Sequence, residues 1–213
     1  MNLAEAFLQD QIPMAQRALV PTALRSAYSA ANAMIAGEPM LNLPSAIPQH
    51  GRLIQLAVDM AFEKLVASGQ FGVDLRWRDF AKPTGKYLEI LFTHSALTIS
   101  QVADPTKQPR DVVFRENKRM AGQVSMDFMR DEAQEVSGRP HILLLHGHRN
   151  LNFAHLAIPE PEHRLGFQHK SSNLMLMMHA VPQIEVPMEE TDIDAVMSLK
   201  EDIEKRMRDD GTQ

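Results

Sequence analysis

Apolar residues recur with helical spacing throughout the first third of this 213-residue chain. Residues 3–8 predict a short helix before Pro13. The segment 22–36 predicts a longer helix, with Pro21 at its start and Gly37 at its end. A second long helix is expected at 50–68, where one apolar stripe is formed by Leu53, Ile54, Ala57, Met60, Ala61, Leu65 and Val66.

From Gly72 onward the apolar period changes from about 3.6 residues to two. Alternation of apolar and polar residues predicts strands at 73–80, 86–92 and 97–102, and the segment 111–116 reads as a fourth. Trp77 falls in register with the apolar positions of its strand, so we expect it to face the core. Short polar turns join these segments. The pattern therefore predicts an antiparallel meander of three or four strands at 72–116.

The second half of the chain adds strands and a final helix. Residues 117–139 are polar and predict a surface connection, whereas 141–148 and 151–159 are apolar enough for buried strands. The Met-rich segment 174–178 fits either a short strand or one helical turn, and the segment that begins at Thr191 predicts an acidic amphipathic helix.

These elements predict an α+β fold in which a helical N-terminal part packs on a mostly antiparallel sheet, followed by an acidic C-terminal helix. The length favours a single domain, 1–213, that is helical over 1–70, β-rich over 71–182 and helical again over 190–209.

Composition excludes several classes of protein. The chain has no cysteine, which rules out a disulfide scaffold, a Cys-ligated zinc module and a thiol enzyme. It has no apolar run of the ~18–20 residues that a membrane-spanning helix needs, and its first residues are not basic. We therefore expect a cytoplasmic protein that does not bind membranes.

Histidine is unevenly distributed, and seven of the nine lie between residues 141 and 179. His146 and His148 are two residues apart, which on a strand places both on one face, and His155 on the next strand would lie opposite them. Three imidazoles arranged in this way can bind a divalent metal. No carboxylate follows at the spacing that known metal motifs require, so ordinary strand-end histidines are the alternative.

A second candidate site is Glu116 with Lys118 at the end of the strand 111–116. Metal-dependent nucleases place a carboxylate and a lysine in this way, because Mg²⁺ prefers oxygen ligands and the attacking water needs a nearby cation. Asp74 is the neighbouring acid that would complete the site, with Glu89 or Asp104 as substitutes, and Glu63 on the preceding helix could add another. The alternative is a solvated strand end.

Basic residues concentrate in one segment of an otherwise acidic chain. The net charge is −5 overall, +3 over 74–119 and −6 over 185–213. The basic segment suggests contact with nucleic acid through Arg76, Arg78, Arg115 and Arg119, although the chain as a whole lacks the basic character usual for such proteins. A solvated surface of mixed charge is the alternative.

No established catalytic motif is present. There is no G-x-S-x-G, no phosphate-binding glycine loop and no H-E-x-x-H. We therefore interpret the chain as a binding or regulatory module without a cofactor, with a protein or nucleic acid as its partner. The alternative is a metal-dependent phosphodiesterase or nuclease that uses a divalent metal. The ligand, the strand order and the oligomeric state are left open.

Overall fold

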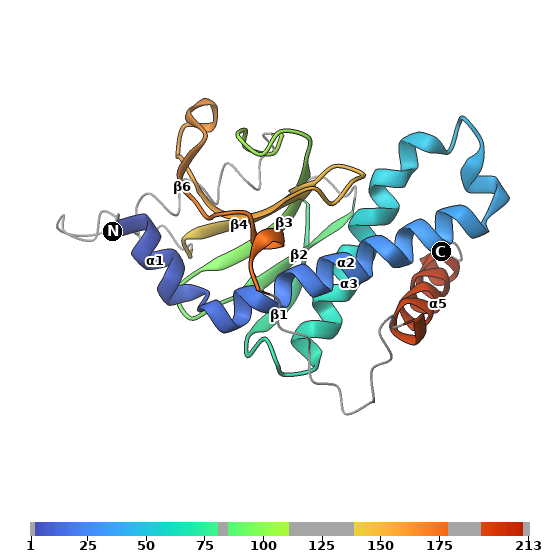
Figure 1. The fold of residues 1–213 in the computed structure, drawn as a ribbon, viewed down its shortest axis with the longest axis horizontal. Helices are drawn as coiled ribbons and strands as arrows, with labels where there is room; N and C mark the ends of the chain where they lie inside the picture. Colours follow the sequence, from blue (N-terminus) through green and yellow to red (C-terminus); the bar gives the residue numbers. More distant parts are fainter. Residues whose placement is uncertain (1–2, 81–84, 111–138, 179–192, 211–213) are drawn as a thin grey trace.

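The computed structural model describes residues 3–80, 85–110, 139–178 and 193–210. Its fold is α+β: helices occupy the N-terminal part and cover one face of a six-stranded, mostly antiparallel sheet (Figure 1). Within these residues no helix is both long and apolar enough to cross a membrane.

Three helices form the N-terminal part, α1 (Leu3–Gln11), α2 (Met14–Gly37) and α3 (His50–Ala67). Arg17 joins the first two, because its buried guanidinium donates to the carbonyls of Leu8 and Ile12 at the end of α1. The prediction that the second helix begins at Pro21 is wrong, since α2 starts seven residues earlier and Pro21 lies within it. The Pro21 ring has no N–H to donate, so the helix lacks one backbone hydrogen bond there. The buried side chains of Leu19 and Val20 extend the apolar face of α2 toward its N-terminus and favour the helix in spite of this.

The strands follow one another across the sheet in sequence order. They are β1 (Asp74–Asp79), β2 (Lys86–Leu91), β3 (Ala96–Val102), β4 (His141–Gly147), β5 (Ala154–Pro159) and β6 (Phe167–Lys170). All neighbours are antiparallel except β3 and β4, which run parallel. The antiparallel β1–β2–β3 meander confirms the alternation read from the sequence. The fourth predicted strand, 111–116, lies outside the described residues, and β6 was not predicted.

The core lies between the sheet and the helices. It is built from the faces of α2 and α3 and from the alternate strand residues that point toward them, Leu88, Ile90, Leu97, Ile99, Ile142, Leu144 and Leu156. Trp77 is half-buried against this core, as its register predicted. A smaller apolar cluster on the other face contains Val102, Leu143, Leu145 and Ala157. The sheet is therefore buried on both faces at its centre.

The last described segments complete the helical layer. The Met-rich segment forms a single 3-10 turn, Leu174–Leu176, rather than a strand. The acidic amphipathic helix is α5 (Ile193–Asp210), and it packs against α2 and α3 through the buried side chains of Leu199 and Ile203. The described ranges contain three further 3-10 turns, Pro39–Asn42, Ile47–Gln49 and His163–Leu165.

Candidate functional site

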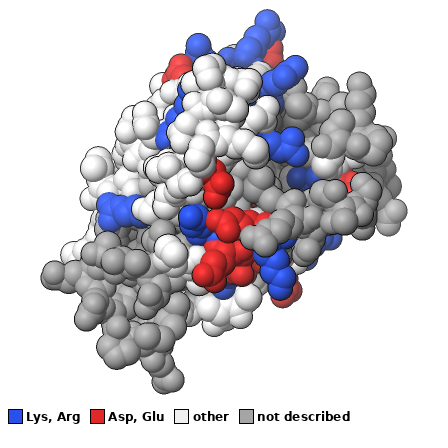
Figure 2. Space-filling model, turned by 90° about the vertical axis from the view of Figure 1, so that its right-hand side faces the viewer, with Lys and Arg blue, Asp and Glu red and all other residues white. Residues whose placement is uncertain are grey.

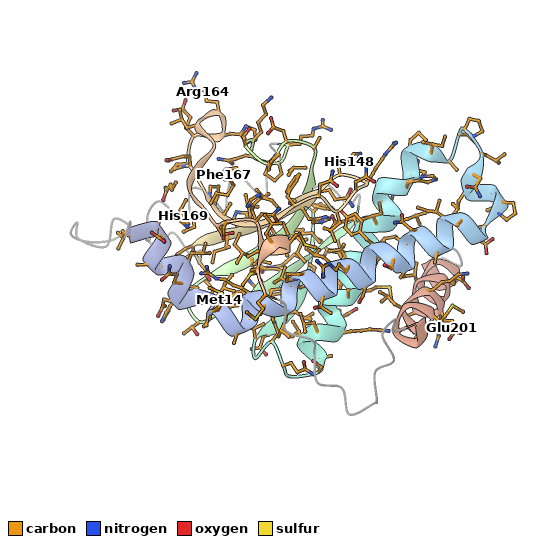
Figure 3. The ribbon with its side chains drawn as sticks, viewed as in Figure 1. Met14, His148, Arg164, Phe167, His169 and Glu201 are labelled. Carbon is orange, nitrogen blue, oxygen red and sulfur yellow. The ribbon has the colours of Figure 1, made fainter. Side chains whose placement is uncertain are left out.

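The structure does not bring the three candidate histidines together. His146 and His155 lie on neighbouring strands but on opposite faces of the sheet, because His146 is paired with Ala154 and His155 with Leu145. His148 is exposed just beyond the end of β4, near α3, whereas His169 lies on the edge strand β6 (Figure 3). Within the described residues no group of three His, Cys, Asp or Glu side chains could hold a metal.

His146 serves the core instead. The Tyr28 hydroxyl donates to the Gly147 carbonyl, so the His146 Nδ1–H donates to the Tyr28 oxygen over 2.8 Å. Burial lowers the pKa of His146 to about 3. The imidazole is therefore neutral and joins β4 to α2.

The basic residues of β1 are held by a buried acid. Glu89 on β2 is fully buried, and its carboxylate accepts from the Nε atoms of Arg76 and Arg78 at 2.5 and 3.3 Å. Both arginine side chains are about half exposed. Their contact with nucleic acid stays a prediction, but part of their charge is neutralised within the sheet.

The predicted nuclease site is only partly visible. Glu116 and Lys118, together with Arg115 and Arg119, lie outside the described residues. Asp74 begins β1, is exposed and is paired with Leu91. It therefore stands at the end of the sheet where the β2–β3 connection lies.

The feature that sequence reasoning missed is an opening between β2 and β3. The two strands are paired only from Leu91–Ala96 to Glu89–Thr98. Both strands continue beyond that point, β2 back to Lys86 and β3 on to Val102, but there they no longer pair with each other. Residues from both strands instead line a cleft with a volume of about 370 Å³. This volume falls within the range of small-molecule sites, roughly 300–1,000 Å³.

Successive turns of α3 form the floor of the cleft. Gly51, Gln55 and Asp59 are spaced four residues apart, so they share one side of the helix, and all three line the cleft. The Gln55 amide nitrogen donates to one Asp59 carboxylate oxygen over 2.8 Å. Above them, the Gln101 amide nitrogen on β3 donates to the Gly51 carbonyl over 2.9 Å. This hydrogen bond links α3 to the part of β3 that does not pair with β2.

Asp59 is the unusual group of the cleft, since it is buried with 8% of its surface exposed. Burial raises the pKa of Asp59 to about 7; the hydrogen bond from Gln55 opposes this shift, and the nearby charge of Glu63 adds to it. The carboxyl group therefore exchanges a proton near neutral pH. Such perturbed acids concentrate at functional sites.

Aromatic and basic side chains form the remaining wall and the open side. Phe80 and Tyr87 line the cleft with their ring centroids 5.4 Å apart. Lys86 and His148 are the exposed members of the lining, so they stand where the cleft meets solvent. The Lys86 ammonium lies 3.7 Å from the Asp79 carboxylate, and both side chains are mostly exposed.

A second, wider cavity of about 590 Å³ lies at the other end of β1 and β2. Its lining includes Asp10, Gln16, Asp74 and Arg139. Its two described acids, Asp10 and Asp74, are both exposed, and we regard it as the weaker candidate.

Charges on the helical end of the molecule are mixed. Figure 2 shows acidic side chains gathered at the centre of this face, with Lys and Arg side chains beside them. At this end Lys64 on α3 and Asp202 on α5 form an ion pair at 2.6 Å. This face is therefore not the basic surface that nucleic-acid binding would need.

Comparison with known proteins adds no assignment. No family model matches the chain, and neither the curated proteins nor the solved structures contain a match to it.

One signal in the sequence pointed to the cleft. In the helix 50–68, Gln55, Asp59 and Glu63 form a polar row at i, i+4 and i+8 inside an otherwise apolar surround. The row ends at Glu63, which accepts a hydrogen bond from the Trp77 indole over 3.2 Å. The spacing alone could not show that the sheet opens above this row.

Proposed function

We propose that the protein is a binding module and that its ligand site is the cleft between β2 and β3. The observation that supports this proposal is the early end of the β2–β3 ladder above a buried acid. An isolated buried carboxyl group is costly, because ionising it away from water opposes folding. A ligand that enters the cleft and donates to Asp59 would compensate this cost.

The cleft has the composition of a recognition site rather than of a catalytic one. Its polar groups are two amides, hydroxyls and a single carboxyl, and the exposed basic groups stand at the opening. The metal-dependent phosphodiesterase or nuclease remains a hypothesis that depends on Glu116 and Lys118. No observation on the described residues favours it.

Methyl and amide NMR spectra of the full chain would test this function. The probes are mononucleotides, amino acids, polyamines and sugar phosphates at millimolar concentration. We expect at least one class to shift the resonances of Gly51, Leu88, Ile99 and Gln101 together. Shifts confined to the wider cavity, or no shift with any class in a folded sample, would contradict the proposal.

A substitution on the floor of the cleft is the matched control. A side chain built at Gly51 would point toward His148 and Gln101, with its Cβ 3.1 Å from the His148 ring and 3.4 Å from the Gln101 oxygen. We therefore expect Gly51→Met to fill the opening and abolish the shifts while the melting temperature changes little. Retained shifts at full strength would mean that the ligand binds elsewhere.

A further inference from the structure

Three of the polar atoms that line the cleft are acceptors without a hydrogen-bond partner among the described residues, beside hydroxyl groups that can donate or accept. Gln55 and Gln101 each use the amide nitrogen on a protein oxygen, because a carboxylate and a carbonyl can only accept. Each amide oxygen is therefore left without a partner among the described residues. The second Asp59 oxygen has no hydrogen bond there either. A ligand that satisfies these three atoms must present N–H or O–H donors.

The aromatic wall favours a flat ligand. Phe80 and Tyr87 are inclined by 32° to each other, and both line the cleft. Planar bases stack on such rings, because every base presents a flat π-face to an aromatic side chain. A flexible aliphatic amine would satisfy the acceptors but would gain little from these rings.

The open side favours a negatively charged end. Lys86 and His148 are exposed members of the lining, and the ion pair of the Lys86 ammonium with another described residue is the 3.7 Å contact with Asp79. An exposed pair of this length holds the ammonium weakly. A phosphate at the opening would bind it without giving up a strong internal contact.

These three features fit one chemical class, and the following inference depends on the proposed function. We infer that the ligand is a nucleotide whose base has an exocyclic amino group. The base enters the cleft beside Phe80 and Tyr87, and its amino group donates one N–H to Asp59 and the other to one of the two amide oxygens. The phosphate stays outside, beside Lys86 and His148.

The test compares nucleotides that differ at a single position of the base. Cytosine has an amino donor where uracil has an oxygen acceptor, and adenine and hypoxanthine differ in the same way. We expect CMP and AMP to bind at least about tenfold more tightly than UMP and IMP, because an acceptor facing Asp59 leaves buried polar groups unpaired. Isothermal titration calorimetry on the full chain at pH 7.5 measures the four affinities.

Substitution of the acid adds a second readout. In Asp59→Asn the side chain gains N–H donors, which can face the uracil oxygen, so the ratio of CMP to UMP affinity should fall toward one. Asp10→Asn, an exposed acid at the end of α1, is the matched control and should keep the wild-type ratio. The wild-type nucleotide pairs decide the question even if Asp59→Asn does not fold.

The outcomes separate this inference from the function on which it depends. Equal binding of CMP and UMP, and of AMP and IMP, would overturn the inference. So would the absence of nucleotide binding when an amino acid or a polyamine shifts the cleft resonances, but the binding function would then stand. If no class of compound shifts those resonances, both proposals fail.

Discussion

The two sides of strand β3 differ in a way that separates structure from function. Toward β4, β3 is paired along its whole length, from Ala96–His141 to Val102–Gly147. Toward β2, pairing stops at Glu89–Thr98 and the strands separate. The first side is closed by a complete ladder, whereas the second side is open and lined with polar groups. An interrupted ladder therefore identifies the part of the sheet that is available to a ligand.

Each side also contains a buried titratable group, and the two groups differ in their hydrogen bonds and in the direction of their pKa shifts. His146, on the closed side, stays neutral and bonds to Tyr28. Asp59, on the open side, is bonded by one amide and titrates near neutral pH. Each group keeps one atom without a hydrogen bond among the described residues, the Nε2 of His146 and the second oxygen of Asp59. Of the two, Asp59 lies beside a cavity, and this position makes it the more informative group about binding.

The largest expected contrast comes from deleting one leucine on each side. Leu144 on β4 is fully buried in the core, so Leu144→Ala should cost about 3–4 kcal/mol of unfolding free energy, within the usual range of roughly 2–5. Leu88 on β2 is equally buried but borders the cleft, and the space left by Leu88→Ala would merge with it. We expect a loss of about 2 kcal/mol there. Urea denaturation measures the unfolding free energy of both variants. Equal losses of unfolding free energy would mean that the cleft is closed in solution.

A pair of glycine substitutions gives a smaller contrast. A methyl group on Gly147 would collide with the Asn150 carbonyl, which belongs to the backbone of the turn after β4. Gly147→Ala should therefore cost about 1–3 kcal/mol. Gly51→Ala meets only the movable side chains of His148 and Gln101, and alanine is favoured in a helix by about 1 kcal/mol. The melting temperature of Gly51→Ala should stay level or rise. A clear fall would mean that the added methyl group has no room in the cleft, which would contradict the open space beside Gly51.

Two opposing pH dependences give a third contrast. The folded state raises the pKa of Asp59 from about 3.9 to about 7, so it binds a proton that the unfolded state releases, and this contribution is lost as pH rises from 4 to 7. The folded state lowers the pKa of His146 to about 3 from about 6.5, so that contribution is lost as pH falls from 6.5 toward 3.

Variants separate the two. Relative to the wild type, Asp59→Asn should gain stability as pH rises from 4 to 7, whereas His146→Gln should gain stability as pH falls from 6.5 to 4. Denaturation at a series of pH values measures both differences. If the stability difference between a variant and the wild type does not vary with pH, the substituted group has the same pKa in the folded and unfolded states.

Much of the fold follows from local patterns. The helix 50–68 and the strands at 73–80, 86–92 and 97–102 were predicted within a few residues, because each has a continuous apolar face that only one period can bury. The start of α2 was not, since a proline typical of a first turn lies inside the helix. The short strand β6 was missed because its four residues show little alternation.

The candidate site was far less predictable. The histidine cluster indicated a metal centre, yet the register of β4 against β5 places His146 and His155 on opposite faces. The row Gln55, Asp59 and Glu63 was visible in the sequence but ambiguous, since a polar row on a helix can equally face solvent.

The sequence by itself determined the type of each element and which of its residues share a face, because periodicity is a property of one continuous segment. Only the tertiary structure decided that β3 runs parallel to β4, that the β2–β3 ladder ends at Glu89 and that Asp59 lies beneath the opening. These features depend on how segments tens of residues apart are placed against one another. That placement is set by the packing of the whole core, and no local pattern encodes it.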